Sequence, residues 1–130
     1  MAPLKSRRTL IVEDDPDSSD ALAHLVRALG HEVACVESCG AALVKIDEWQ
    51  PTVVLLDLML PDAQGGLVLR RVRHMHVPAR VAVITAAGEE SLILKHAVSF
   101  EPDAVFLKPL NHEQIREWLE SSEQPATNGV

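Results

Sequence analysis

Short apolar runs alternate along the chain with longer segments in which apolar and polar residues recur at helical spacing. The apolar runs are rich in Val, Leu and Ile. Such runs are typical of strands that are covered on both faces, as in a parallel sheet. The predicted strands are Thr9–Val12, Glu32–Val36, the centre of Pro51–Pro61, Arg80–Thr85 and Asp103–Leu107.

The first predicted helix has signals at both ends. Asp15 is expected to be its N-cap, Pro16 fits the first helical position, and Gly30 fits the C-terminal cap. Four more helices are expected, beginning at Ser38 or Gly40, after Gly66, after Glu89-Glu90 and before Ile115. Their inward-facing residues should include Ala42, Leu43, Ile46, Trp49, Val68, Val72, Met75, Ile115, Trp118 and Leu119.

Five strand–helix repeats with short connections predict one α/β domain, with a parallel sheet and helices on both faces. In open sheets of this kind, sites form beyond the carboxyl ends of the strands, near the point where the strand order reverses. The residues that follow each strand are therefore the first candidates for chemistry.

Composition narrows the classes of function. The 130 residues fit one domain, and a net charge of −7 argues against direct contact with nucleic acid or an anionic membrane. No apolar run approaches the roughly 20 residues of a membrane span. The sequence shows neither a cleavable signal segment nor a cysteine pairing pattern, so we expect a cytoplasmic protein. The six histidines are scattered along the chain and are expected at the surface. Residues 1–8 are expected to form a basic arm, and 122–130 a polar tail or the start of a linker.

Polar residues stand at the ends of four predicted strands. They are Glu13 and Asp14, Asp57, Thr85 and Lys108. Because carboxylates at short range repel one another, the cluster predicts a bound cation, and oxygen ligands favour Mg²⁺. A metal ion, an ammonium group and a hydroxyl around Asp57 suit a carboxylate that accepts a phosphoryl group. Each residue alone fits an ordinary loop, cap or strand exit, but their joint occurrence favours the functional interpretation.

These motifs resemble those of the response-regulator receiver domains of two-component signalling, across about residues 8–121, and the receiver domain itself is expected to span residues 9–121. The matching segments are Glu13-Asp14, Asp57–Gly65, Thr85-Ala86 and Lys108-Pro109. The resemblance implies a flavodoxin-like, doubly wound (βα)5 fold with strand order 2-1-3-4-5. It also implies that Mg²⁺ is held by Glu13, Asp14, Asp57 and the backbone carbonyl of Met59.

The resemblance further implies that Asp57 accepts a phosphoryl group from a phosphohistidine of a sensor histidine kinase or phosphotransfer protein. Thr85, Ala86 and Lys108 would contact that group, and Pro109 is a candidate for a cis peptide bond. Phosphorylation would then shift the face made by the fourth helix, fifth strand and fifth helix, where an unknown output partner would bind.

Two departures from the family pattern fall near that face. The family usually places Phe or Tyr three residues before the lysine, but this chain has Val105, and the adjacent Phe106 should point to the opposite side of the sheet. The family also usually has Gly seven residues before the lysine, where this chain has Glu101. Our hypothesis is that the phosphorylation chemistry is intact and that the signal leaves by an altered route.

The fourth helix carries more apolar residues than one core stripe needs: Leu92, Ile93, Leu94, Ala97, Val98 and Phe100. Either the helix lies deep against the sheet, or it exposes a patch that docks a partner or a second copy, as a weak or phosphorylation-dependent homodimer.

Met59 and Ala87 flank the predicted phosphoryl site, and neither side chain can hold an attacking water by strong hydrogen bonds. Self-dephosphorylation is therefore expected to be slow.

Other functions fit the residues less well. A nucleotide or flavin binder of the same architecture needs phosphate-cradling amides after the first strand, where Glu13 and Asp14 would repel phosphate. A magnesium-dependent aspartyl phosphatase wants a second Asp where this chain has Met59. A docking-only receiver would not need the full polar set. A stand-alone regulator and the receiver of a longer DNA-binding transcription regulator both remain open.

Overall fold

Five strands and five helices alternate along the residues that the structure, a computed structural model, describes: 7–63, 65–86, 88 and 90–121. The strands are β1 (Arg8–Val12), β2 (Glu32–Val36), β3 (Val53–Asp57), β4 (Arg80–Thr85) and β5 (Ala104–Leu107). The helices are α1 (Pro16–Ala28), α2 (Cys39–Trp49), α3 (Gly66–His74), α4 (Leu92–Val98) and α5 (His112–Ser121). The predicted tail and most of the predicted basic arm lie outside the described residues.

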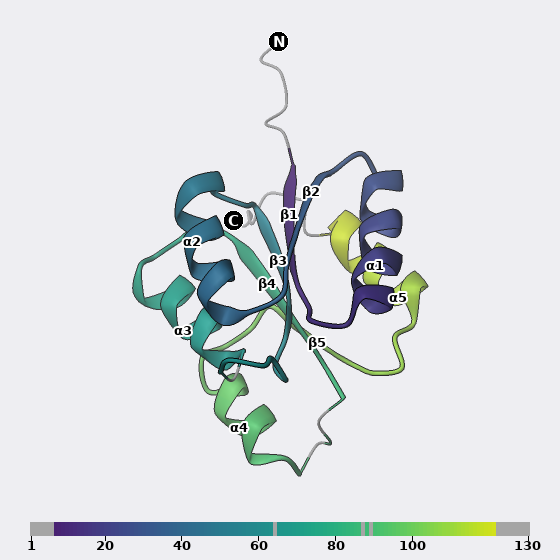
Figure 1. Ribbon diagram of the computed structural model, residues 1–130. Coiled ribbons are helices and arrows are strands. Elements are labelled where there is room, and N and C mark those ends of the chain that lie inside the picture. Colours follow the sequence, from purple (N-terminus) through teal and green to yellow (C-terminus); the bar gives the residue numbers. More distant parts are fainter. Residues whose placement is uncertain (1–6, 64, 87, 89, 122–130) are drawn as a thin grey trace, which may run out of the picture.

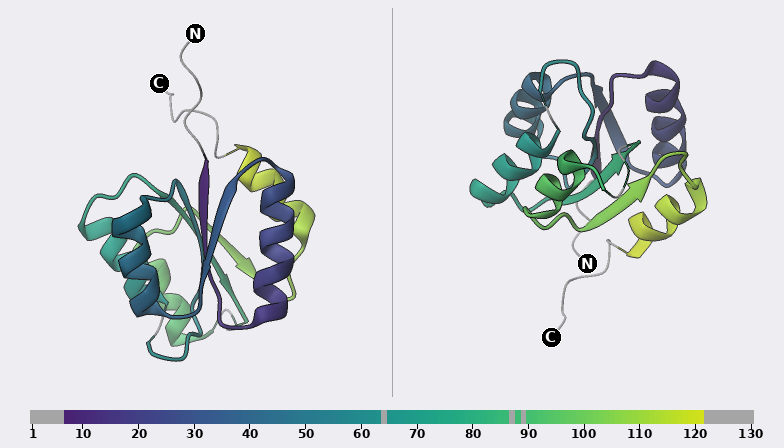
Figure 2. Two further views of the ribbon diagram at one scale, coloured as in Figure 1. Left: turned by 45° about the horizontal axis from the view of Figure 1, so that its top comes forward. Right: turned by 90° about the horizontal axis from the view of Figure 1, so that it is seen from below.

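The strands form one parallel sheet in the order β2-β1-β3-β4-β5. Helices α1 and α5 cover one face, and α2, α3 and α4 cover the other (Figure 1). The view from below shows the two helix layers on opposite sides of the strands (Figure 2). The predicted fold class and strand order are confirmed. The order reverses between β1 and β3, so the switch point lies where these central strands end.

Alternate residues of the central strands belong to two separate hydrophobic cores. Leu10 and Val54 pack with α2, α3 and α4, whereas Ile11 and Leu55 pack with α1 and α5. This division follows from the two-residue period of a strand, which sends successive side chains to opposite faces. All five residues of β3 are buried, as its unbroken apolar run predicts.

The helix ends follow the predicted capping chemistry. The carboxylate of Asp15 accepts a 2.9 Å hydrogen bond from the backbone N–H of Ser18, and Pro16 takes the first helical position of α1. Gly30 has φ +92°, a conformation that favours glycine. Ser38 is the N-cap of α2 and accepts a hydrogen bond from Ala41 N–H. Local sequence therefore sets where α1 and α2 begin.

Two expectations about burial are wrong. Met75 was expected to face inward but is 56% exposed, because α3 ends at His74 and its helical period stops there. His31 is buried rather than exposed, and its Nδ1 is hydrogen-bonded to the Thr9 hydroxyl at 2.8 Å.

Among the described residues, no helix combines the length and the apolar character needed to cross a membrane.

Candidate functional site

The predicted polar residues meet at one edge of the sheet. Glu13 directly follows β1, Asp57 ends β3, Thr85 ends β4 and Lys108 directly follows β5. Since all five strands are parallel, these positions share the carboxyl edge of the sheet, which faces the viewer in the right panel of Figure 2. Glu13, Asp57 and Thr85 are buried there, and Asp14 is exposed.

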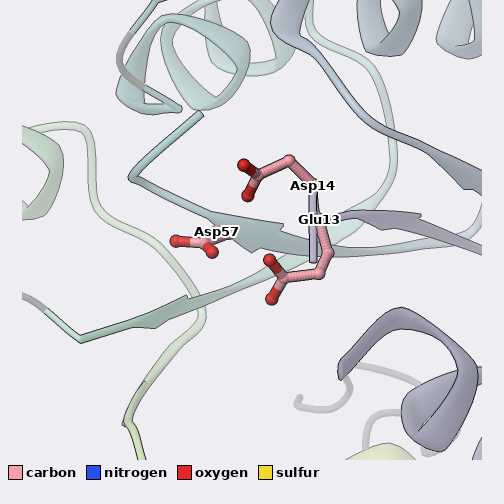
Figure 3. Close-up of side chains that lie close together, drawn as sticks. All are labelled: Glu13, Asp14 and Asp57. Carbon is pink, nitrogen blue, oxygen red and sulfur yellow. The ribbon is translucent and has the colours of Figure 1, made fainter. Parts of the chain in front are cut away.

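Three carboxylates form the centre of this site. Each of Glu13, Asp14 and Asp57 offers one oxygen that lies within 4.8 Å of the other two. Figure 3 shows their carboxylates around one common space. Three carboxylate oxygens are the hard donors that Mg²⁺ prefers, and the exposed Asp14 leaves one side open to water or a phosphate oxygen. The donor set therefore fits Mg²⁺.

Lys108 bridges the two buried carboxylates. Its Nζ donates to Glu13 Oε1 at 2.7 Å and to Asp57 Oδ2 at 3.0 Å. The second oxygen of each carboxylate accepts a backbone hydrogen bond, from Asp15 N–H to Glu13 at 3.1 Å and from Met59 N–H to Asp57 at 2.9 Å. All four oxygens are thus held in place by donors from three separate segments.

Burial and charge shift the pKa values of Glu13 and Lys108. Burial raises the pKa of the Glu13 carboxyl above its ordinary value, and the hydrogen bond from Lys108 only partly opposes this. Burial alone would lower the pKa of Lys108, but its hydrogen bonds and ion pairs with Glu13 and Asp57 outweigh burial and raise it. Lys108 therefore stays a cation beside the Asp57 carboxylate.

The remaining predicted residues lie along the same edge. The backbone carbonyl of Thr85 accepts a 2.8 Å hydrogen bond from Lys108 N–H, and Ala86 is exposed in the loop after β4. The peptide bond between Lys108 and Pro109 is cis. Contacts of Thr85 and Ala86 with a phosphoryl group, and the role of the Met59 carbonyl, stay predictions. Ala87 lies outside the described residues.

Gly65 closes the loop that follows β3. Its N–H donates to Leu58 O at 2.8 Å. A Cβ at this position would lie 2.1 Å from the carbonyl oxygen of Asp57 and 2.8 Å from the Cα of Leu58. Both are backbone atoms that cannot rotate away. With φ −59°, the position needs glycine for space and not for conformational freedom.

The aromatic residue of β5 packs on the side of the sheet opposite to Val105, as predicted. Phe106 contacts Trp118 of α5 edge to face, at 6.2 Å between ring centroids, and belongs to the core under α1 and α5. Val105 is 39% exposed. The position where the family usually has its switch aromatic is therefore filled by a partly exposed valine.

Sequence reasoning missed the role of Arg73, near the end of α3. Its guanidinium donates to the carbonyl of Glu101 at 2.8 Å and to Asp103 Oδ2 at 3.0 Å, beyond the C-terminal end of α4. Asp103 Oδ2 also accepts Val81 N–H of β4 at 2.7 Å. Glu101 adopts φ +56°, which explains why glycine would suit this position. The partners of Arg73 are distant in sequence, so no local pattern signals them.

The fourth helix exposes part of its apolar surface. Leu92 is 80% and Val98 47% exposed, while Leu94 and Ala97 are buried. On the neighbouring β5, Leu107 is 41% exposed. This distribution favours the exposed-patch alternative over a helix that lies deep against the sheet.

Comparison with known proteins agrees with the fold. The family model described as "Response regulator receiver domain" matches residues 9–120. The chain therefore belongs to the receiver domains of two-component response regulators, which are signal-transduction proteins. Receiver domains generally bind Mg²⁺ at an acidic pocket and are phosphorylated by sensor kinases or phosphotransfer proteins.

The curated relatives are regulatory proteins. Sensory transduction protein RegX3 of Mycobacterium bovis is 42% identical over 82 residues, which cover 62% of this chain and 35% of that protein. The positive alginate biosynthesis regulatory protein of Pseudomonas aeruginosa is 33% identical over 121 residues, which cover 89% of this chain and 47% of that protein. The chain thus spans half or less of the length of these relatives.

Solved receiver structures share the fold. A CheY-like receiver domain protein from Methanospirillum hungatei superposes with a TM-score of 0.80 at 27% identity, covering 92% of this chain and 98% of that one. A LuxR-family DNA-binding response regulator from Staphylococcus aureus gives a TM-score of 0.82 at 26% identity, covering 91% and 99%. Five parallel strands in the order seen here are the shared architecture.

Proposed function

We propose that residues 9–121 form a phosphorylation-controlled switch of the cytoplasm, in which Asp57 accepts a phosphoryl group from a phosphohistidine. The donor would be a sensor histidine kinase or a phosphotransfer protein. The observation that carries the proposal is the convergence of Glu13, Asp14 and Lys108 on the Asp57 carboxylate. The protein would act as a signalling protein that promotes its own phosphorylation, and not as a metabolic enzyme.

In the transfer step, a carboxylate oxygen of Asp57 forms a bond to phosphorus while the phosphorus–nitrogen bond of the phosphohistidine breaks. The electron pair of that bond stays on the imidazole nitrogen. Hydrogen bonds from Met59 N–H and Lys108 fix the orientation of the attacking carboxylate. The Lys108 ammonium, with the Thr85 hydroxyl and the segment at Ala86, would face the charge on the transferred group.

A metal ion completes this proposal. Glu13, Asp14, Asp57 and the backbone carbonyl of Met59 would hold Mg²⁺, which when bound neutralises charge on the phosphoryl oxygens. The acidic cluster supports this assignment because two of its three carboxylates are buried and need a cationic partner. Lys108 supplies part of that compensation.

Incubation with acetyl phosphate and Mg²⁺ tests the proposal. We expect intact-protein mass spectrometry to show one added phosphoryl group on the wild type and none on Asp57→Ala, because the substitution removes the accepting oxygen. Chelation of Mg²⁺ should also prevent the addition. A protein that never acquires the adduct, or an Asp57→Ala variant that acquires it equally, would refute the proposal.

An apolar groove beside Lys108 suits a docking partner. It has a volume of about 330 Å³, and its walls include Ala21 of α1 together with Pro109 and Leu110 of the segment after β5. Lys108 lines this groove and also donates to Asp57, so a partner seated there would bring its phosphohistidine near that carboxylate. We therefore propose that the phosphoryl donor contacts α1 and the β5–α5 segment.

Slow loss of the phosphoryl group is a second expectation. The side chain of Met59 is 50% exposed at the site but offers no strong hydrogen bond that could hold an attacking water. Phosphorylated protein, freed of donor, should retain its added mass unless a phosphatase is present, whereas Met59→Asn should lose it faster. Rapid loss from the isolated wild type would contradict this prediction.

The signal is proposed to leave through the α4-β5-α5 face without the usual aromatic switch. If Val105 causes the altered route, Val105→Tyr should change how hydrogen exchange of α4 responds to acetyl phosphate, and should change phosphorylation-dependent affinity for an output partner. Val44→Tyr, at an exposed valine of α2, is the matched control. Identical responses of wild type and Val105→Tyr would contradict the hypothesis.

The exposed apolar patch on this face would also accommodate a weakly bound second copy of the chain.

A longer DNA-binding regulator is the second candidate. The DNA-binding response regulator MtrA of Mycolicibacterium smegmatis is 39% identical over 67 residues, and this match covers 29% of that protein. If the chain is the receiver of such a regulator, a gel-shift assay should detect DNA binding only with sequence beyond residue 130. The net charge of −7 predicts no DNA binding by the receiver itself.

A further inference from the structure

The loop between β3 and α3 is tied to a different helix by one carboxylate. Asp62 Oδ1 accepts a hydrogen bond from Cys39 N–H at 2.9 Å, and its Oδ2 accepts one from Gly40 N–H at 3.0 Å. Cys39 and Gly40 are the first two residues of α2. The contact therefore joins segments that are 22 and 23 residues apart in the sequence.

The chemistry of this contact is that of a helix cap supplied from elsewhere in the chain. Ser38, the N-cap of α2, satisfies Ala41 N–H, which leaves the N–H groups of Cys39 and Gly40 to Asp62. The first turn of α2 contains no acidic residue, so Asp62 supplies the negative charge that the positive end of a helix dipole favours. These backbone hydrogen bonds lower the pKa of Asp62, so the carboxylate stays charged.

A second contact reinforces the connection. The buried thiol of Cys39 donates to the carbonyl of Ala63, the residue after Asp62, at 3.5 Å. Ala42 and Ile46 of α2 are buried in the core beneath, so the helix is a firm base for the loop. By contrast, Met59 in the same loop is half exposed, so its own side chain adds little to the packing of Leu58 and Leu60 on either side of it.

We propose that Asp62 is a positioning residue for the metal-binding loop: by holding the loop on α2, it sets the place of the Met59 backbone. Met59 lies three residues before Asp62, and its N–H already orients Asp57 Oδ1. Its carbonyl would be a ligand of Mg²⁺, so the inference rests on the proposed function. Groups that hydrogen-bond metal ligands directly typically change metal affinity about 10- to 100-fold when removed, and Asp62, which acts through the loop, should act at the lower end of that range.

A Mg²⁺ titration without any phosphoryl donor tests the inference, with binding followed by amide chemical shifts. Asp62→Ala should raise the Kd for Mg²⁺ about tenfold. Asp62→Asn keeps one accepting oxygen and should restore part of the affinity. Asp47→Ala removes the same charge from an exposed position of α2 and should leave the Kd unchanged.

A merely structural cap predicts a different pattern. In that case Asp62→Ala would lower the stability of the metal-free protein and the exchange protection of the Cys39 and Gly40 amides, yet leave the Kd for Mg²⁺ unchanged, which would overturn the inference. Equal losses in Asp62→Ala and Asp47→Ala would also overturn it, since charge alone would then explain them. If wild type forms the acyl phosphate while Asp62→Ala binds Mg²⁺ normally, only this inference fails. If wild type neither binds Mg²⁺ nor forms the adduct, both proposals fail.

Discussion

Replacing Lys108 by alanine is expected to slow formation of the acyl phosphate at Asp57 about 100-fold, the typical effect of removing one donor that faces developing charge. The ammonium lies 3.0 Å from Asp57 Oδ2 and would face the charge on the transferred group. The rate would be measured by mass spectrometry with acetyl phosphate and saturating Mg²⁺. Lys108→Arg keeps the charge with a different shape and should retain part of the rate.

The same substitution should also destabilise the metal-free protein. It leaves the buried Glu13 and Asp57 carboxylates without their shared cation, at a cost of about 1–3 kcal/mol, since Lys108 itself is partly exposed. This loss of stability should be smaller at acid pH, because Glu13 then takes up a proton and no longer needs a cation. It should also be smaller when Mg²⁺ is added. Chemical denaturation at several pH values measures it.

The matched control for Lys108 is Lys95→Ala. Lys95 pairs at 3.7 Å with Glu90, whose side chain is 97% exposed, so its removal should change stability by less than about 0.5 kcal/mol and leave the rate intact. A Lys108→Ala variant with the wild-type rate would show that the lysine has no part in the transfer.

Gly65→Ala is expected to lower the free energy of unfolding by about 1–3 kcal/mol and to disturb the acceptor site. The added methyl carbon would lie 2.1 Å from the Asp57 carbonyl oxygen, so the loop or the end of β3 must move. Because Met59 lies in that loop, phosphorylation should slow as well. Denaturation midpoints and the acetyl phosphate assay measure the two effects.

The adjacent Gly66 offers a control for this prediction. A Cβ there would meet the Cβ of Ala97 at 3.6 Å, an ordinary van der Waals contact, and Gly66 is the first residue of α3. Gly66→Ala should therefore stay within about 0.5 kcal/mol of wild type. Alanine has the higher helix propensity, so helix propensity cannot cause a loss at Gly66, and similar losses at both glycines would show that the clash with β3 does not set the cost.

Much of the fold was predictable because local chemistry and global packing agree. The apolar run before Asp57 is long enough for one fully buried strand, and Asp15-Pro16 and Ser38 each carry their own capping signal. The acidic cluster was predictable for another reason. Parallel strands bring their carboxyl ends together, so polar residues at those ends must meet once the strand order is known.

What escaped prediction depends on contacts between distant segments. Arg73 reaches Asp103 across two helix ends, and Asp62 reaches Gly40 across the edge of the sheet, with no periodic pattern to announce either contact. The exposure of Met75 was mispredicted because helical periodicity does not say where the helix ends. Long-range hydrogen bonds and helix termini were thus the limits of sequence reasoning here.

The division of the sheet into two cores makes this chain a practical scaffold for a biosensor. A fluorescent reporter attached at the exposed Val98 would lie on the α4 side, while Phe106 and Trp118 pack on the other. Labelling should therefore perturb the α4 side of the sheet without loosening the α1 and α5 layer. A change in reporter fluorescence on adding a phosphoryl donor would then report phosphorylation without knowledge of the natural output partner.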